Sequence, residues 1–476
     1  MPFLPVFLWT DILIYILLAV VISAVLYIRR HPHLRTPWKS VLSRKRGVIS
    51  IMILLCYVAV GLLDSVHFRI ALPTDSTDAS QQTSETVHYS TEVTTLLDLA
   101  ILPLREQVEK TYSAPFATHL FVREMTTLEQ GKLNYDYPKL KYAGAHLKND
   151  QNKSSDITNS VIINSLSVVL AWFVVLILMT LYLARRHHVT WLKTIKQVML
   201  GQLNYPYLTV FFTLLLLSLL GFNLAVLSSQ YHILGTDKVG QDVLYQTMKS
   251  VRTGLVIGTL TTLVMLPLAL FMGIAAGYFK GWIDDVIQYI YTTLNSIPGV
   301  LLIAAAVLML QVYMNNHPES FVTIAERADM RLLFLCIILG LTSWTGLCRI
   351  LRGETLKLRE AEYVLAARAL GAGSLTILHR HILPNLMHIV MITIVLDFSG
   401  LVLAEAVLSY VGVGVDPSMI SWGNMINSAR LEMAREPVVW WSLTAAFISM
   451  FTLVLAANLF ADVVRDAFDP RMQATQ

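Results

Sequence analysis

The chain has 476 residues, of which 55% are hydrophobic and only 14% are charged, and its formal net charge is +4. This composition excludes an ordinary water-soluble globular protein, in which about a quarter of the residues are charged. The apolar residues form long runs, which predicts an all-α polytopic membrane protein, and the sequence carries no basic patch interleaved with aromatic residues of the kind that binds nucleic acid.

Nine apolar runs are predicted to span the bilayer. A span needs about 20 residues, and the second run is short by this measure. The N-terminal run lacks the basic start and the small-residue cleavage site of a signal peptide, so we expect it to remain as an anchor. The runs lie near 11–28, 48–63, 160–184, 207–228, 253–277, 286–312, 331–348, 386–408 and 439–462.

The basic residues of three loops predict the orientation. Because loops rich in Lys and Arg stay in the cytoplasm, the loops after the first, third and seventh runs are predicted to lie there. The N-terminus is then outside and the C-terminus inside. The residues are Arg29, Arg30, Arg35, Lys39, Arg44, Lys45 and Arg46; then Arg185, Arg186, Lys193 and Lys196; then Arg349, Arg352, Lys357, Arg359, Arg368 and Arg380.

The insert, residues 64–158, is predicted to lie outside. Its opening, 73–95, is rich in Ser, Thr, Asp and Gln and is expected to be flexible, whereas 96–110 and 115–130 are expected to form helices. Two interpretations stay open, a small external domain and a tether packed on the membrane face. Long structureless segments are uncommon inside compact folds, so we expect the insert to lie outside the pore and its removal to be tolerated.

Several spans and their flanks carry further signals. After the fourth run, Thr236 and Asp237 are predicted to cap a short amphipathic helix that leads back into the bilayer. Two small-residue pairs in the fifth run, Gly254-x-x-x-Gly258 and Gly273-x-x-x-Gly277, favour close helix packing within the subunit over a dimer contact. Pro298-Gly299 is predicted to kink the sixth span. Candidate pore or gate residues are Pro298, Asp397 and Glu405, the last two because ionisable groups in a span are costly without a functional or hydrated site.

The polar interruption Arg349–Asn385 lies between two spans and must be an aqueous loop, yet its residues have helical spacing. Gly371 is predicted to end a first helix in the left-handed region. Ser374 is predicted to cap a second helix, which Pro384 closes. The apolar positions are Tyr363, Ala366, Ala367 and Leu370 in the first helix, and Leu375, Leu378 and Ile382 in the second.

This loop resembles the EAA loop of ABC-importer permeases, through Leu365-Ala366-Ala367, Gly371 and the HILP of His381–Pro384. The ending RHILPN is closest to the dipeptide/oligopeptide/nickel branch. One departure is that Leu365 stands where the family has glutamate, with Glu360 and Glu362 one to two turns away. In the family the loop docks on a cytoplasmic ATPase, so the resemblance implies that role for Tyr363, Leu365, Ala366, Ala367, Arg368, Leu370, Gly371 and Pro384.

Three other stretches resemble the same branch. The external signature LGTDxxGRDVLSR is matched at Gly235, Thr236 and Asp237, with Gln241 and Tyr245 replacing its arginine and serine. Leu408–Arg430, with Ser421, Trp422 and Gly423, resembles an external loop of these permeases. Asn458–Arg471 resembles their C-terminal signature.

The resemblance implies a type I ABC importer transmembrane domain over 201–476, with the loop at 349–385, preceded by an N-terminal extension over 1–200. It implies a permease subunit in the bacterial inner membrane that carries short peptides or peptide-like solutes, nickel chelates included. The implied partners are a homologous permease, two ABC ATPases and an external substrate-binding protein. The sequence has no GxxxxGK[ST] phosphate loop, so ATP and Mg²⁺ are expected in the ATPases and this chain is not expected to be an enzyme.

Two alternatives from other classes remain. An ion-gradient-driven secondary transporter needs ion-coupling groups at mid-bilayer, for which Asp397 is the candidate. A membrane sensor or scaffold would use the insert as its functional part. No metal site is expected, because His187-His188 and His379-x-His381 lack further ligands at a suitable spacing.

Overall fold

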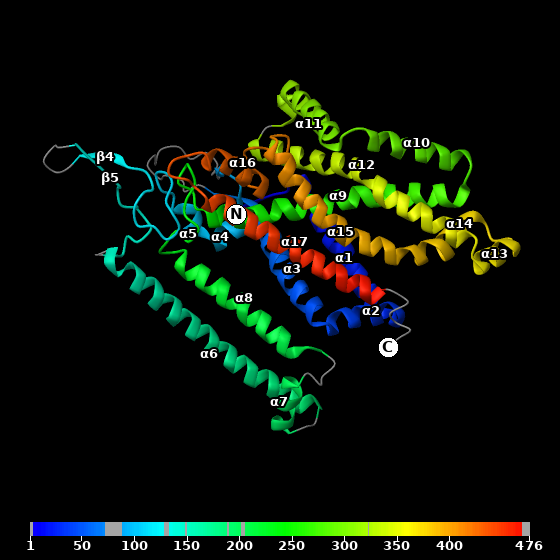
Figure 1. The fold of residues 1–476 in the computed structure, drawn as a ribbon, viewed down its shortest axis with the longest axis horizontal. Coiled ribbons are helices and arrows are strands. Elements are labelled where there is room, and N and C mark those ends of the chain that lie inside the picture. Colours follow the sequence, from blue (N-terminus) through cyan, green and yellow to red (C-terminus); the bar gives the residue numbers. More distant parts are fainter. Residues whose placement is uncertain are drawn as a thin grey trace, which may run out of the picture. The chain divides into compact units, whose positions relative to one another are not determined.

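The computed structural model describes residues 3–71, 88–127, 133–147, 150–187, 190–200, 205–321 and 323–468. Its described part is mainly helical (Figure 1). Nine helical segments in these ranges are long and apolar enough to cross a membrane: Trp9–Arg30, Lys45–Asp64, Asp150–Arg185, Tyr207–Leu227, Val243–Phe279, Gly299–Asn316, Ile324–Arg359, Ser374–Tyr410 and Trp441–Phe468. The predicted all-α polytopic membrane fold is therefore confirmed.

The chain forms two compact units, and each is described by itself. The first comprises residues 1–6, 39–252 and 420–456, and the second comprises 7–38, 253–419 and 457–476. Three helices, α2 (Pro32–Ser43), α9 (Val243–Phe279) and α17 (Trp441–Phe468), continue from one unit into the other.

In the first unit, three membrane-length helices pack side by side. They are α3 (Lys45–Asp64), α6 (Lys153–His187, preceded by η1, Asp150–Asn152) and α8 (Tyr207–Leu227). Between α6 and α8, which Figure 1 draws alongside each other, the Trp172 indole donates a hydrogen bond to Ser218 at 2.6 Å and its ring lies edge-on to Phe211. Short α7 (Trp191–Met199) follows α6, and α16 (Trp422–Glu432) lies in the same unit.

The insert adds a small β-structure to this unit. Strand β1 (Phe3–Val6) pairs antiparallel with β2 (His67–Ile70), and β2 pairs with β3 (Thr94–Thr95). Two five-residue helices follow, α4 (Leu96–Ala100) and α5 (Leu102–Glu106). Most of the predicted flexible opening, together with residues 128–130, lies outside the described residues.

The helix expected over 115–130 is wrong, because the described part of this stretch, 115–127, contains no helix and includes strand β4 (Glu124–Thr127), which pairs antiparallel with β5 (Leu133–Asp136) (Figure 1). The β-branched and aromatic residues on either side, such as Val122 and Tyr135, favour a strand over a helix. Before the hairpin the two flanks are already paired, since His119 and Lys139 form an antiparallel bridge and Leu120 N–H donates to Pro138 O at 2.9 Å.

The insert packs on the segment between α8 and α9. Ser113 N–H donates to the Thr236 hydroxyl at 2.7 Å, and Glu109 N–H donates to Gly240 O at 2.9 Å. A β-carbon on Gly240, whose φ is +77°, would lie 1.8 Å from Glu109 O, so only glycine fits this approach. The backbone of the insert therefore bonds directly to the loop between α8 and α9, so the insert is more closely packed than a simple tether.

The second unit contains α1 (Trp9–Arg30), α10 (Trp282–Ser296), α11 (Gly299–Asn316), η2 (Pro318–Ser320) and α12 (Ile324–Arg359). The loop elements α13 (Glu362–Ala369), α14 (Ser374–Ile377) and the π-helix η3 (Leu378–Ile382) lead into α15 (Leu383–Tyr410). At the start of α1, the Thr10 backbone and hydroxyl both donate to the Asp329 carboxylate of α12. The N-terminal span is thus fastened to the permease-like helices of its own unit.

The predicted close packing at glycine is confirmed within the second unit. A β-carbon on Gly273 would lie 2.8 Å from Cys348 O, and one on Gly277 would lie 2.5 Å from the Thr355 β-carbon, both on α12. A β-carbon on Gly258 would likewise lie 2.4 Å from the Phe398 ring of α15. Helix α9 therefore approaches its neighbours as closely as bare backbone allows.

The single kinked span expected over 286–312 is wrong. The structure breaks it into α10 and α11, because Ile297 is extended at φ −91° and ψ 130° immediately before Pro298. A residue before proline is pushed out of the helical region by the proline ring, so the helix ends there instead of bending through. Helix α11 restarts at Gly299.

Candidate functional site

The loop 349–385 is built as a turn between two long helices. Helix α12 continues past the apolar run as far as Arg359, α13 follows after a two-residue break, and Figure 1 places α13 and α14 where α12 and α15 meet. Gly371 has φ +81°, as predicted. Its N–H donates to Arg368 O at 3.0 Å and the N–H of Ala372 donates to Ala367 O at 3.1 Å, which is the Schellman pattern of helix ends.

The second half of the loop differs from the prediction at two residues. The N-cap of α14 is Gly373 and not Ser374, which is already the first helical residue. Pro384 does not close a helix but lies in the first turn of α15. The π-helix Leu378–Ile382 widens the backbone just before it, so the missing proline N–H and the ring are accommodated without ending the helical run.

One side of the loop is buried. Val364 is 2% exposed, Ile377 1% and Ile382 0%, and they join a hydrophobic cluster with residues of α9, α10 and α12. Burying a side chain of this size stabilises by about 1.5–3 kcal/mol. The predicted apolar face of Leu375, Leu378 and Ile382 is thus wrong, since Leu375 lies on the opposite, exposed side.

The other side is exposed and partly apolar. Leu370 is 88% exposed and Leu375 is 80% exposed, while Tyr363 and Leu365 are each close to half exposed. Ala366 and Arg368 are exposed between them, and Ala367 is half-buried. Two exposed leucines thus lie on a buried base. We define residues 362–376 as the coupling knob, named for the role that the resemblance implies.

Polar contacts fix this base to the neighbouring helices. The Arg352 guanidinium makes a two-pronged ion pair with Asp284 of α10, at 2.6 and 2.7 Å. Arg359 donates to Tyr278 O at 2.9 Å. Inside the loop, the Asn385 amide donates to the Tyr363 hydroxyl at 3.0 Å, which joins the two ends of the turn.

The loop after α8 does not form the helix predicted from Thr236 and Asp237. Thr236 is fully buried and its hydroxyl donates to Thr111 O at 2.9 Å, while Asp237 accepts from the backbone of Val239 and Gln241. The cap of α9 is Asp242, whose carboxylate accepts from Leu244 N–H at 2.7 Å. Side-chain bonds across the loop thus replace the expected local helix. Gly235, with φ +72°, lies beneath the Trp441 indole, which donates to Thr236 O.

A buried charge cluster that sequence reasoning missed holds this loop. His232 is 1% exposed and its Nδ1 lies 2.7 Å from Asp242, while its Nε2 lies 3.6 Å from Glu109 of the insert. Burial opposes protonation, but the hydrogen bond to Asp242 and the nearby Glu109 carboxylate outweigh it and raise the pKa of His232 to about 9. The 123-residue separation of Glu109 from His232 leaves no local pattern that could have revealed the pair.

The remaining predicted residues are structural or half-buried. The Ser421 hydroxyl accepts from Asn424 N–H at 3.0 Å and so caps α16, while Trp422 is 1% exposed and Gly423 is buried. Pro298 is exposed at the break between α10 and α11, and Asp397 is half-buried. Glu405 is 1% exposed and accepts from the Ser409 hydroxyl at 2.8 Å, so its carboxylate is packed inside the chain. Among the described residues, no group of three His, Cys, Asp or Glu side chains could hold a metal ion.

Comparison with known proteins decides the family. Residues 269–474 match the family described as "Binding-protein-dependent transport system inner membrane component". Over 248 residues the chain is 32% identical to the glutathione transport system permease protein GsiD of Pectobacterium atrosepticum. The matched region covers 52% of this chain and 75% of that protein. The chain belongs to the peptide family of ABC-importer permeases.

Two further relatives agree. The permease is 33% identical over 239 residues to the oligopeptide transport system permease protein OppC of Mycobacterium tuberculosis, or 50% of this chain and 76% of that one. It is 31% identical over 243 residues to a putative peptide permease protein of Brucella suis, and the matched region covers 51% of this chain and 74% of that protein. The family match contains the coupling knob, Pro298, Asp397 and Glu405 but not residues 1–268, so the insert and the first spans of this permease lie outside it.

Proposed function

We propose that this permease forms, with a homologous permease, the path for short peptides or peptide-like solutes in an ATP-driven importer. The importer also contains two cytoplasmic ABC ATPases, the coupling knob is the element of this chain that docks on an ATPase, and an external binding protein delivers the cargo. The observation that carries the proposal is the exposure of Leu370 and Leu375 on a base buried through Val364, Ile377 and Ile382. Large apolar side chains that are exposed together on an aqueous loop are typical of a surface that binds another protein.

The coupling role follows from mechanics. The base of the knob is continuous with α12 and α15 and is fastened to α10 through Arg352 and Asp284. A push on the exposed leucines therefore moves long helices and not a loose loop. Leu365, half exposed where the family has glutamate, makes the contact apolar at that point. ATP and Mg²⁺ belong to the ATPase partners.

The remaining assignments follow from this role. Residues 201–476 are the permease domain, 1–200 are an extension, and the protein resides in the bacterial inner membrane with its N-terminus outside and C-terminus inside. Pro298 at the helix break and Asp397 are the candidate path-lining groups; the burial of Glu405 favours a packing role for that residue. The relatives' printed names, glutathione and oligopeptide transport, support a peptide-like cargo.

The test is co-purification of the permease with the ATPases of the same importer. Leu370→Glu is expected to reduce the recovered ATPase about tenfold or more, because removing a central apolar anchor costs an interface at least that much. Met125→Glu, at a 70% exposed apolar residue of the insert, is the matched control and should leave recovery unchanged. Equal recovery in both variants, with normal amounts in the membrane, would contradict the docking role of the coupling knob.

A further inference from the structure

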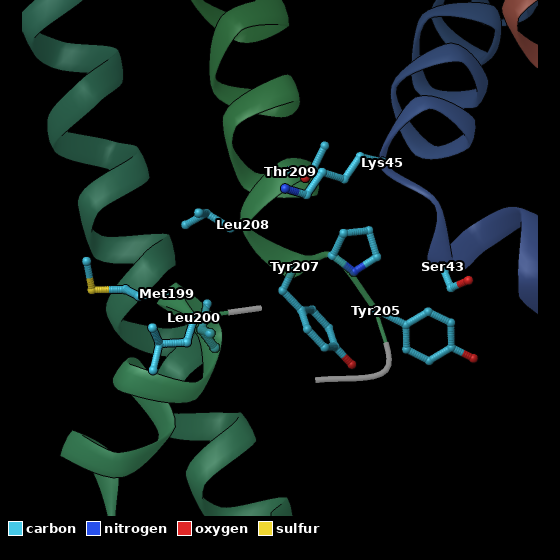
Figure 2. Close-up of a pocket in the computed structure, with 10 residues that line it drawn as sticks. Ser43, Lys45, Met199, Leu200, Tyr205, Tyr207, Leu208 and Thr209 are labelled. Carbon is cyan, nitrogen blue, oxygen red and sulfur yellow. The ribbon is translucent and has the colours of Figure 1, made fainter. Parts of the chain in front are cut away.

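A cavity of about 220 Å³ lies in the first unit, where α3 and α8 begin and α7 ends. It is lined on one side by Ser43 and Lys45, and on the other by the ends of α7 and α8. Figure 2 shows the Lys45 side chain reaching from the start of α3 toward Thr209 on α8. The lining residues beyond these are Val198, Met199, Leu200, Tyr205, Pro206, Tyr207 and Leu208.

The cavity lies at the edge of the membrane. Lys45 and Tyr207 are the first residues of two membrane-length helices, so the lining groups are at the level where apolar span gives way to water. The Tyr205 and Tyr207 rings lie edge-on, with centroids 6.2 Å apart. Tyrosine is enriched at this level because its ring is apolar and its hydroxyl is polar.

The charge around the cavity is of one sign. Residues 39–50 contain Lys39, Arg44, Lys45 and Arg46, residues 190–200 contain Lys193 and Lys196, and neither stretch contains Asp or Glu. The first turns of α3 and α8 also lack acidic residues. The carbonyl end of α7 faces the cavity, and Lys196 in its last turn compensates its dipole. The site is thus suited to an anion.

Helix α7 carries a second sign of the membrane surface. It has only nine residues, too few for a span, and Thr194 and Val198 are buried while Leu192 is 76% exposed and Met199 is 70% exposed. Lys193 and Lys196 are exposed beside this apolar stripe. A short helix with exposed apolar and basic residues side by side is typical of one that lies in the headgroup layer.

We propose that this cavity binds the phosphate of an anionic membrane phospholipid, with the Lys45 ammonium and the Thr209 hydroxyl as donors. The tyrosine rings and Leu208 receive the apolar part of the lipid next to the headgroup. The cavity is smaller than the roughly 300–1,000 Å³ of drug-sized ligand pockets, which fits a headgroup better than a peptide. This binding is separate from transport and does not rest on the proposed function.

The test uses the purified full chain, stripped of lipid in detergent, with thermal unfolding followed during titration. The probes are dioleoylphosphatidylglycerol, dioleoylphosphatidylcholine and inorganic phosphate. A ligand that binds the folded protein alone raises its unfolding temperature with concentration. Phosphatidylglycerol is expected to raise it, and the other two probes are expected to raise it far less.

Lys45→Gln is expected to weaken the apparent affinity for phosphatidylglycerol about fivefold, the usual factor for one basic residue at an anionic lipid. Arg46→Gln removes the same charge from the next residue, which does not line the cavity, and should leave the affinity within about twofold of the wild type. Thr209→Val is expected to weaken it as well and tests the site without a change of charge. Equal loss in Lys45→Gln and Arg46→Gln would reduce the effect to diffuse attraction and overturn the site. An equal response to inorganic phosphate would overturn the lipid assignment.

Discussion

Gly371 is where backbone conformation and the proposed docking surface meet. Its φ of +81° penalises any β-carbon by about 1 kcal/mol, yet among the described residues no atom lies within 4 Å of where that carbon would be. Gly371→Val is therefore expected to distort the turn without disturbing the core. ATPase recovery and transport-coupled hydrolysis should fall severalfold while the membrane-inserted amount stays near normal.

Gly373 provides the matched control for this change. It has an ordinary φ of −65°, and again no described atom lies within 4 Å of the added β-carbon. Gly373→Ala should leave hydrolysis coupled, because neither strain nor a clash results. Normal coupling in Gly371→Val, with the protein present in vesicles at wild-type amounts, would show that the knob is not the docking element.

His232 predicts how stability depends on pH. Its pKa rises from 6.5 when unfolded to about 9 when folded, so the protonated form stabilises the fold by roughly 3 kcal/mol. That stabilisation is complete below pH 6.5 and is lost as the pH rises through 9. The free energy of unfolding, measured across pH 6 to 10, should therefore fall between about pH 6.5 and 9 and level off above pH 9.

His232→Asn should remove this dependence and lower the stability at pH 7, because Asp242 and Glu109 lose the cation between them. His119→Asn, at a histidine about one-third exposed, is the control and should keep the wild-type profile. A flat profile in the wild-type protein would mean that His232 is neutral when buried.

At the scale of elements, hydropathy predicted most spans, because a helix that crosses the membrane needs an apolar run of about 20 residues. It failed at Pro298, where proline was visible but the choice between a kink and a break depended on packing. It failed at Pro384 in the opposite sense, since the π-helix that admits this proline has no sequence signature. The strand at Glu124–Thr127 was missed because its partner, Leu133–Asp136, becomes visible only in the fold.

Helix α10, too short to span alone, is predicted to depend on α12 for its position. Two side-chain contacts connect these helices. Arg352 forms a two-pronged ion pair with Asp284, and the Thr345 hydroxyl donates to the Asn295 amide oxygen at 3.1 Å. Arg352→Lys keeps the charge but loses the fork, and should cost about 1–2 kcal/mol. Thermal unfolding measures the cost, with Arg380→Lys at an exposed loop site as the control. Equal unfolding temperatures for the two variants would contradict this dependence.

At the scale of the whole molecule, the insert is more integrated than its composition predicted. Asp98 of α4 pairs with Lys249 of α9 at 3.0 Å, and Glu109 faces His232. Removing about residues 74–150 would take one carboxylate from each cation, leaving Lys249 with Asp64 and His232 with Asp242. It would also remove the backbone hydrogen bonds that Ser113 and Glu109 donate to Thr236 and Gly240. The contacts thus revise the expectation of easy removal and predict poor assembly, measured as the membrane-inserted fraction that resists detergent aggregation.

A smaller deletion separates the hairpin from this packing. Residues 120 and 138 are already joined by a hydrogen bond of 2.9 Å, so 122–137 can be replaced by two glycines without moving either end. This variant should assemble and bind ATPases like the full chain. If it fails while the larger deletion succeeds, the hairpin and not the buried ion pairs holds the insert in place.

The orientation of the chain is the last prediction. The segment Ser374–Tyr410 has 37 residues, or about 55 Å of helix, well beyond the roughly 30 Å of a bilayer core. Its two flanks must therefore emerge on opposite sides, and the basic residues before it assign the cytoplasm to the flank with Lys357.

Cysteines replacing Lys357, which is exposed, and Ser418, also exposed, report the two flanks. Ser80, a third position of interest, lies outside the described residues, and Met125 replaces it as a reporter for the insert. The background carries Cys56→Ala, because Cys56 is exposed while Cys336 and Cys348 are buried.

In intact cells with a permeabilised outer membrane, an impermeant maleimide should label Ser418→Cys and Met125→Cys but not Lys357→Cys. After lysis all three should react, which shows that the unlabelled site was shielded by the membrane and not by the fold. Labelling of Lys357→Cys before lysis would reverse the orientation, and the coupling knob would then face away from any cytoplasmic ATPase.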